Sequence, residues 1–170
     1  RSEIYFRIDS TRFQFEQLVK MLDEIYFKGE KIDNETRLNP LPLIMNSSKL
    51  KVSYLLENII FNITSLFDYF AILINYVVAK TDRIYDWNKL QSYARGNSGI
   101  FSIDDTGDLK NVILDVHNVF VDKLYNYRSE LIHRKSDVVL CEGSHDYAND
   151  KINIQYFCTE KQLKTFGLEN

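Results

Sequence analysis

Residues 48–80 read SKLKVSYLLENIIFNITSLFDYFAILINYVVAK. Leucine, isoleucine and valine recur there at helical spacing, and several phenylalanines widen the apolar arc. A helix that is apolar nearly all round is typical of the centre of a bundle. The part from 59 to 78 has about the length of a membrane span. Its polar residues favour a buried helix of a soluble protein instead, so we predict no membrane segment. These residues are Asn62, Thr64, Ser65, Asp68 and Asn75.

A polar strip interrupts the apolar surface of this helix. Asn58, Asn62, Ser65 and Tyr69 follow one another by three or four residues, and Asp68 lies beside them. Such a strip forms either a seam of hydrogen bonds between helices or one wall of a substrate groove. The seam is the interpretation we favour.

A second long helix is predicted from about residue 105 to residue 135. Acidic residues at its start and basic residues at its end suit the helix dipole. We expect it to pack antiparallel to the first long helix. Its predicted core stripe consists of Leu109, Val112, Ile113, Val116, Phe120, Leu124 and Leu131.

Shorter elements are predicted around these two helices. Residues 3–8 alternate and predict a short strand, and residues 11–28 predict an amphipathic helix with Phe13 in its apolar stripe. The segment 29–47 contains both prolines and predicts a loop. A short helix is expected over 86–95, around Trp87 and Leu90.

The C-terminal region changes period. From 137 to 158 the pattern alternates, which predicts an antiparallel hairpin. A two-residue turn at Asn149-Asp150 would place Cys141 opposite Cys158 and leave one face largely apolar. Two cysteines are too few for a disulfide framework, and we expect both to be reduced, because the predicted location is intracellular.

The chain has 170 residues, of which 45% are hydrophobic, and this suits one mainly α domain. We expect a helical bundle over 10–135 with the hairpin of 137–158 attached. The formal charge of −3 argues against a general nucleic-acid binder but leaves room for a local basic site. The predicted location is cytoplasmic. No cluster of histidine, cysteine and acidic residues predicts a metal site or a cofactor.

Residues 125–135 read YNYRSELIHRK and place Arg128 five positions before His133, near the end of the second long helix. This arrangement resembles the HEPN motif, an Arg followed by four to six residues and a His in a helical bundle. The earlier helix supports the resemblance, because its segment around Asp68 is similar to the HEPN helix that supplies an acidic partner. The resemblance spans roughly residues 10–135.

The resemblance implies a homodimer that cleaves RNA, not DNA, without a metal. The 2′-hydroxyl attacks the neighbouring phosphate, so the reaction needs proton transfer and a cation to stabilise the charged phosphorane. We expect Arg128 to stabilise the phosphate, His133 to transfer protons and Asp68 to orient one of them. Substrate contacts are expected from Ser129, Arg134 and Lys135. The resemblance also suggests a toxin or phage-defence setting, with an antitoxin protein as a further partner.

Two features leave other interpretations open. Ser129 stands where active HEPN members often carry Asn, Asp or His. Five residues of straight α-helix also separate Arg128 from His133 by about 140° around the axis. Arg128 could instead form a structural ion pair with Asp68, and His133 could interact with the helix end. The alternative function is a non-catalytic module that binds a nucleotide, RNA or protein, and a further one is a structural dimerisation domain.

Overall fold

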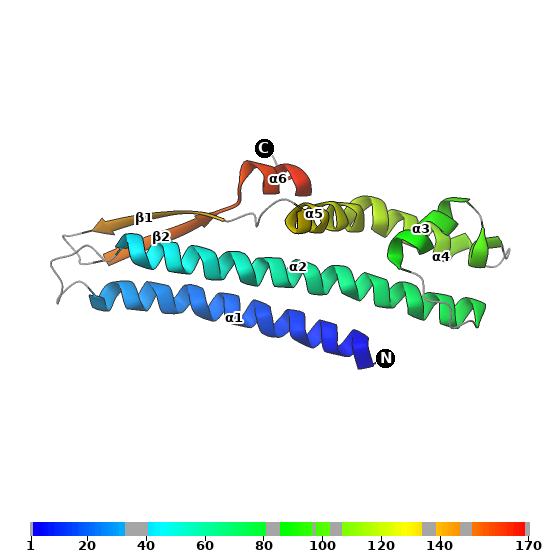
Figure 1. Ribbon diagram of the computed structural model, residues 1–170, viewed down its shortest axis with the longest axis horizontal. Helices are drawn as coiled ribbons and strands as arrows, with labels where there is room; N and C mark the ends of the chain where they lie inside the picture. Colours follow the sequence, from blue (N-terminus) through cyan, green and yellow to red (C-terminus); the bar gives the residue numbers. More distant parts are fainter. Residues whose placement is uncertain are drawn as a thin grey trace. The chain divides into compact units, whose positions relative to one another are not determined.

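The computed structural model describes residues 2–32, 41–80, 86–96, 98–102, 107–133, 139–146 and 151–168. Over these residues the protein is mainly helical with a small antiparallel sheet, as the sequence predicts (Figure 1). The elements are α1 (Ser2–Ile32), α2 (Leu41–Ala79), α3 (Trp87–Gly96), the 3₁₀ turn η1 (Gly99–Ser102), α4 (Gly107–Val116), the π-helical turn η3 (His117–Val121), α5 (Asp122–His133), β1 (Leu140–Asp146), β2 (Lys151–Phe157) and α6 (Glu160–Phe166).

The chain forms two compact units. The first comprises Arg1–Thr11 and Ile60–Glu130, and the second comprises Arg12–Ile59 and Leu131–Asn170. Both α1 and α2 contribute residues to each unit, because the boundary falls within these two helices.

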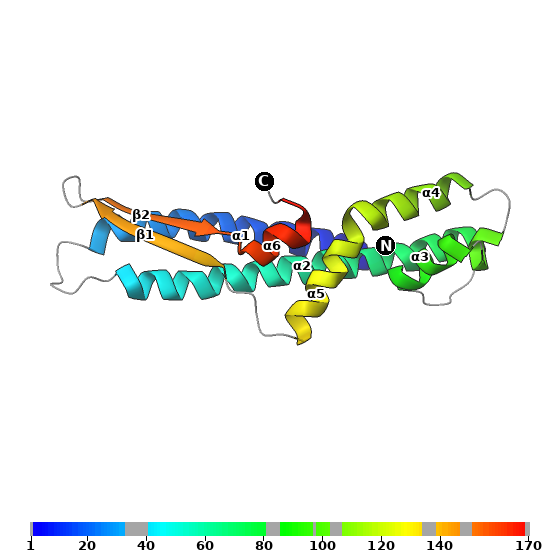
Figure 2. The ribbon, with the colours of Figure 1, turned by 90° about the horizontal axis from the view of Figure 1, so that it is seen from above.

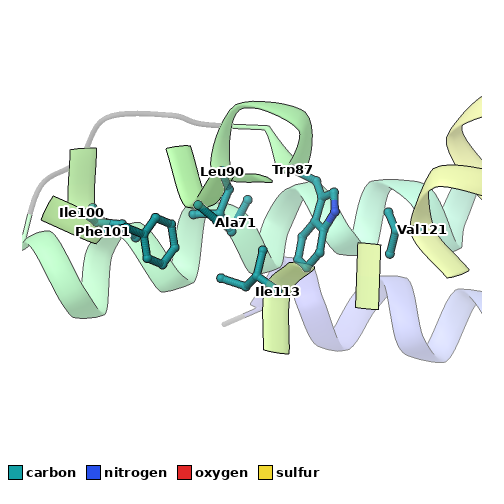
Figure 3. Close-up of a cluster of buried hydrophobic side chains, with 8 residues drawn as sticks. Ala71, Trp87, Leu90, Ile100, Phe101, Ile113 and Val121 are labelled. Carbon is teal, nitrogen blue, oxygen red and sulfur yellow. The ribbon is translucent and has the colours of Figure 1, made fainter. Parts of the chain in front are cut away.

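The first unit is built around Trp87, the first residue of α3, which is 3% exposed. Figure 3 shows its ring among apolar side chains from α2, η1, α4 and η3. Phe67 of α2 packs edge-on against this indole, with the ring centroids 5.0 Å apart. The buried members of the cluster are Ala71, Trp87, Leu90, Ala94, Ile100, Phe101, Ile113 and Val121.

A π-helical turn interrupts the second predicted helix and changes which residues it buries. Across His117–Val121 the hydrogen bonds run from residue i to i+5, which inserts one residue into the helical repeat. His117 and Val121 are buried, whereas Phe120 is 42% exposed and Val112 57% exposed. The predicted stripe is therefore wrong at Phe120, because it assumed an uninterrupted α-helix. It is also wrong at Val112, which lies before the π-helical turn on the exposed side of α4. Ile113 and Leu124 are buried as predicted.

The second unit combines the adjoining parts of α1 and α2 with the hairpin, which lies along the helices in both views (Figures 1 and 2). Leu18, Val52 and Val139 form its buried cluster, and Tyr156 of β2 packs against them. The Ser53 hydroxyl accepts a 3.0 Å hydrogen bond from the Val139 backbone N–H and so fixes the start of the hairpin on α2.

The hairpin is present, but its predicted register is wrong. Cys141 pairs with Tyr156, and Leu140 pairs with Phe157, which places Cys158 beyond the end of β2. The shift amounts to two residues and therefore keeps every side chain on its predicted face. Both cysteines are free thiols. The predicted turn at Asn149-Asp150 lies outside the described residues.

The N-terminal segment is helical, so the strand predicted over 3–8 is wrong. A six-residue alternation is short enough to fit either period, and α1 accepts it by leaving Tyr5 and Phe6 exposed. Phe13 is also 60% exposed, contrary to its predicted core position. Thr11 lies inside the helix, where its hydroxyl donates to the Arg7 carbonyl oxygen.

Among the described residues, the α2 segment Met45–Val78 is long and apolar enough to cross a membrane. Core helices of soluble proteins meet the same criteria of length and composition. The cytoplasmic location and the absence of a membrane segment therefore stay predictions.

Candidate functional site

Asp68 lies in the C-terminal half of α2 and accepts hydrogen bonds from two other elements of the first unit. Its Oδ1 lies 3.1 Å from the backbone nitrogen of Trp87, which begins α3. Asp86 binds the same helix end, since its Oδ1 accepts from the Lys89 backbone N–H at 2.7 Å. Both carboxylates thus satisfy N–H groups that a helix start leaves without partners, and both suit the positive end of its dipole.

The second donor to Asp68 is Tyr125 of α5. Its hydroxyl makes a short hydrogen bond to Asp68 Oδ1 and lies 3.3 Å from the carbonyl oxygen of Thr64. Burial, reinforced by this hydrogen bond and by the charge of Asp68, raises the pKa of Tyr125 well above its usual value. The phenol therefore keeps its proton and acts as a fixed donor to the carboxylate.

Arg128 lies one turn after Tyr125 and faces the same carboxylate. Its Nη1 is 4.0 Å from Asp68 Oδ2, and the two side chains are 30% and 31% exposed. The guanidinium carbon also lies 5.5 Å from the centroid of the Phe61 ring, a cation–π contact. Arg128 Nε is buried and has no hydrogen-bond partner among the residues that the structure describes. The guanidinium is thus held between a carboxylate and a ring, with part of its surface open to solvent.

The structure brings two of the three predicted catalytic residues together, namely Asp68 and Arg128. Ser129 is exposed on α5, next to Arg128 in the chain. His133 is the last residue of α5, and the backbone is α-helical throughout Asp122–His133. Positions 128 and 133 are therefore about 140° apart around the helix axis, as the sequence geometry predicts. Arg134 and Lys135 lie outside the described residues.

Tyr125 is the member of this site that sequence reasoning missed. The signal was present, because a residue three positions before Arg128 lies beside it on the same helical face. Its role depends on Asp68, which is 57 residues away in the chain. Only the packing of α5 on α2 places the two groups in contact.

The predicted polar strip contacts α1 through Asn62, which is 6% exposed. Its Oδ1 accepts a 2.8 Å hydrogen bond from Nη1 of Arg7, and its Nδ2 lies 3.5 Å from the Ser10 hydroxyl. Ser65 bonds to the carbonyl oxygen of Phe61 in its own helix. The interpretation as a seam between helices is confirmed for Asn62.

His117 is a buried histidine of the first unit and is 6% exposed. Its Nδ1 accepts a 3.4 Å hydrogen bond from the Trp87 indole, and its Nε2 lies 3.9 Å from Asp122 Oδ1. Burial lowers the pKa of His117 below 6.5, with Asp122 acting in the opposite direction and Arg95 reinforcing the decrease. The imidazole is therefore neutral at pH 7, which suits its acceptor role toward the indole.

Within the described ranges, no group of three or more His, Cys, Asp or Glu side chains is arranged to hold a metal ion. The comparisons with protein-family models, curated proteins and solved structures found no match to this chain.

Proposed function

We propose that this chain is a HEPN-like RNA-processing domain in which Arg128 binds and stabilises the phosphate at the point of cleavage. The observation that carries the proposal is the setting of Arg128. Its guanidinium lies 4.0 Å from Asp68 and over the Phe61 ring, and 30% of the side chain stays accessible. A positively charged group fixed in this way meets a phosphorane with little reorganisation, which is the main requirement of electrostatic catalysis.

The neighbouring groups give the arginine its position. Tyr125 and the Trp87 backbone N–H both donate to Oδ1 of Asp68, so that carboxylate is fixed before it contacts Arg128 through Oδ2. A fork-shaped guanidinium matches two phosphate oxygens better than an ammonium group does. In this proposal Asp68 and Tyr125 are positioning residues, and Arg128 is the residue that touches the substrate.

Proton transfer is assigned to His133, in line with the resemblance. Histidine exchanges protons near neutral pH, as the attack of the 2′-hydroxyl and the departure of the leaving oxygen require. Because positions 128 and 133 lie on different sides of one helix, a site assembled from two chains accounts more simply for their joint action. We therefore also propose a homodimer in which each chain contributes to a shared RNA site.

One observation favours a second candidate function. Positions 128 and 133 belong to the same uninterrupted α-helix, which separates them around its axis. A module that binds the RNA phosphate through Arg128 and cuts nothing needs no convergence of the two residues. Binding without cleavage is therefore the alternative that the experiment must separate from catalysis.

The test is cleavage of a fluorescent single-stranded RNA by the purified protein in EDTA. We expect products ending in a 2′,3′-cyclic phosphate, because the resemblance implies attack by the RNA's own hydroxyl. His133→Ala should lower the rate by about 10²–10⁴-fold, the usual contribution of a positioned acid or base. Arg128→Ala should lower kcat more than it raises KM, because the charge it meets develops in the transition state.

Two further variants test whether the effect is specific to the guanidinium of Arg128. Arg128→Lys should not restore the rate, because an ammonium group cannot make the paired contacts of a guanidinium. Arg95→Ala is the matched control, since Arg95 is an exposed arginine that bonds to Asn118 outside the proposed site, and it should leave the rate unchanged. Wild-type protein that binds RNA through Arg128 but releases no product would establish the binding module. Wild-type protein that neither binds nor cuts RNA would refute both functions.

A further inference from the structure

A groove between α1 and α2 in the second unit is separate from the residues assigned to RNA processing. It has a volume of about 420 Å³, within the range of small-molecule sites. Gln17, Lys20 and Met21 line it from α1, and Lys51, Tyr54 and Leu55 line it from α2. Figure 1 shows these parts of the two helices side by side.

Each helix contributes a pair of exposed residues three positions apart, which therefore neighbour each other on the helix surface. On α1 the pair is Gln17 and Lys20, and on α2 it is Lys51 and Tyr54. Between the pairs lie Met21 and Leu55, which pack against the buried cluster of this unit and form an apolar floor. The groove thus combines two ammonium groups with an exposed aromatic ring above an apolar base.

Lys20 and Lys51 favour a negatively charged ligand. None of the described residues that line the groove is acidic, although the whole chain carries a net charge of −3. Two ammonium groups on opposite walls suit an anion with several oxygens, such as a phosphate.

The remaining lining residues favour a planar aromatic ring over an alkyl chain. The Tyr54 side chain is 56% exposed, so its ring offers a surface on which another ring can stack. The Met21 thioether makes favourable contacts with aromatic rings and adapts to their shape. A long alkyl chain gains most from an enclosed apolar cavity, whereas four of these lining side chains are exposed to solvent: Gln17, Lys20, Lys51 and Tyr54.

We propose that this groove binds a nucleotide, with its base between Tyr54 and Met21 and its phosphate between Lys20 and Lys51. A free nucleotide and one unit of a single-stranded RNA present the same ring and phosphate to the groove. This proposal is independent of Arg128 and of cleavage, since all its residues belong to the second unit.

The chain contains a direct reporter for this test, because Met21 and Met45 are its only methionines. Labelling the methionine methyl groups with carbon-13 gives one signal in the groove and one internal control. Adenosine 5′-monophosphate should shift the Met21 methyl signal upfield in a saturable way, through the ring current of the stacked base. The Met45 signal should stay in place. Octanoate and inorganic phosphate, which lack the ring, should cause little change at Met21.

Variants then assign the contacts. Lys20→Met and Lys51→Met should each weaken adenosine monophosphate binding by about fivefold, the scale of one solvent-exposed charge contact. Tyr54→Leu should reduce the upfield shift as well as the affinity. Lys49→Met is the matched control on α2, because Lys49 does not line the groove, and it should leave the affinity unchanged. Each Lys→Met variant adds one methyl signal of its own. A Met45 methyl signal that keeps its wild-type position before ligand is added verifies that each variant is folded.

Titration with a short single-stranded oligoadenylate distinguishes the two sources of the ligand. Tighter binding than that of the mononucleotide, with the same loss in Lys51→Met, would assign the groove to an RNA strand, and equal binding would assign it to a free nucleotide. Octanoate that shifts Met21 as strongly as adenosine monophosphate would overturn the proposal. So would an equal loss of affinity in Lys49→Met, which would mean non-specific charge attraction. Absence of cleavage in the RNA assay would not affect the conclusion about nucleotide binding in the groove.

Discussion

Replacing Asp68 should destabilise the protein far more than replacing Arg128, although the two side chains contact each other. Asp68→Ala removes an acceptor from the start of α3, a loss of about 1 kcal/mol. It also takes an ionised acceptor from Tyr125, which is worth about 1.5–3 kcal/mol before the nearby Thr64 carbonyl offsets part of it. The ion pair adds less than about 1 kcal/mol, because both groups are partly solvated.

Together these terms predict that Asp68→Ala lowers the free energy of unfolding by roughly 3 kcal/mol. Arg128→Ala removes only the ion pair and the contact with Phe61, so its expected effect is about 1 kcal/mol. The reason for the difference is that Asp68 keeps both of its hydrogen-bond donors when Arg128 is absent. In a chain of this length, these values correspond to decreases in Tm of about 6–12 °C and about 2–4 °C.

Urea unfolding followed by circular dichroism measures both effects. Asp68→Asn is the control, because an amide oxygen can still accept from the Trp87 N–H and from Tyr125, and its loss should lie near that of Arg128→Ala. Arg128→Ala that destabilises the protein as strongly as Asp68→Ala does would contradict this expected difference. Arg128 would then be a structural ion-pair residue, and its assignment to the substrate would lose its basis.

Three further outcomes follow from the fold. Phe67→Ala should lower the free energy of unfolding, measured in urea, by about 3–5 kcal/mol. Phe120→Ala should lower it by only about 1 kcal/mol, because Phe120 is 42% exposed. Equal losses would contradict the burial pattern that the π-helical turn produces. Nuclear Overhauser contacts across the hairpin should join Cys141 to Tyr156. Contacts from Cys141 to Cys158 would instead restore the register predicted from sequence. Because burial lowers the pKa of His117, the folded state binds fewer protons than the unfolded state below pH 6.5. The free energy of unfolding should therefore fall as the pH drops below that value. His117→Gln should make the free energy of unfolding depend less on pH in this range. An unchanged pH dependence in this variant would assign the effect to another group.

The elements that the sequence predicts well are those with long and regular patterns. The α2 helix carries more than thirty residues of apolar periodicity, and the structure contains it from Leu41 to Ala79. It begins seven residues earlier than predicted, so residues 41–47 of the predicted loop are helical. Residues 3–8 offered only six positions, which fit an alternation as well as a helical repeat. The α-helical conformation of these residues in α1 is supported by contacts with residues outside that segment, such as the hydrogen bond from Arg7 to Asn62.

The hairpin shows which part of a strand prediction depends on local pattern and which does not. Alternation placed Cys141 and Tyr156 on the same face, and both side chains are partly buried. Register depends in addition on the length of the connection, and alternation is unchanged when that length changes by two residues. The pattern therefore predicted the face correctly and the pairing wrongly.

For the candidate site, the sequence identified the contact between Asp68 and Arg128 but not the support around it. The cap on α3 joins residues 19 apart, and the bond to Tyr125 joins residues 57 apart. Neither follows from local spacing, because each requires the packing of α3 or α5 on α2. The same contacts explain how Asp68 can stabilise the fold and also contact Arg128.

The π-helical turn connects the fold of the first unit to this site. One residue of an α-helix corresponds to a rotation of about 100°, so the residue inserted between His117 and Val121 rotates all of α5 relative to α4 by about that angle. Without it, Tyr125 would lie about 120° and Arg128 about 60° around the helix axis from the buried Ile113, whereas the inserted residue reduces these angles to about 20° and about 40°. With it, both side chains face α2 and contact Asp68. The departure from regular helix that made the core stripe wrong at Phe120 is thus the feature that aligns the candidate site, which accords with the frequent occurrence of π-helical turns at functional positions.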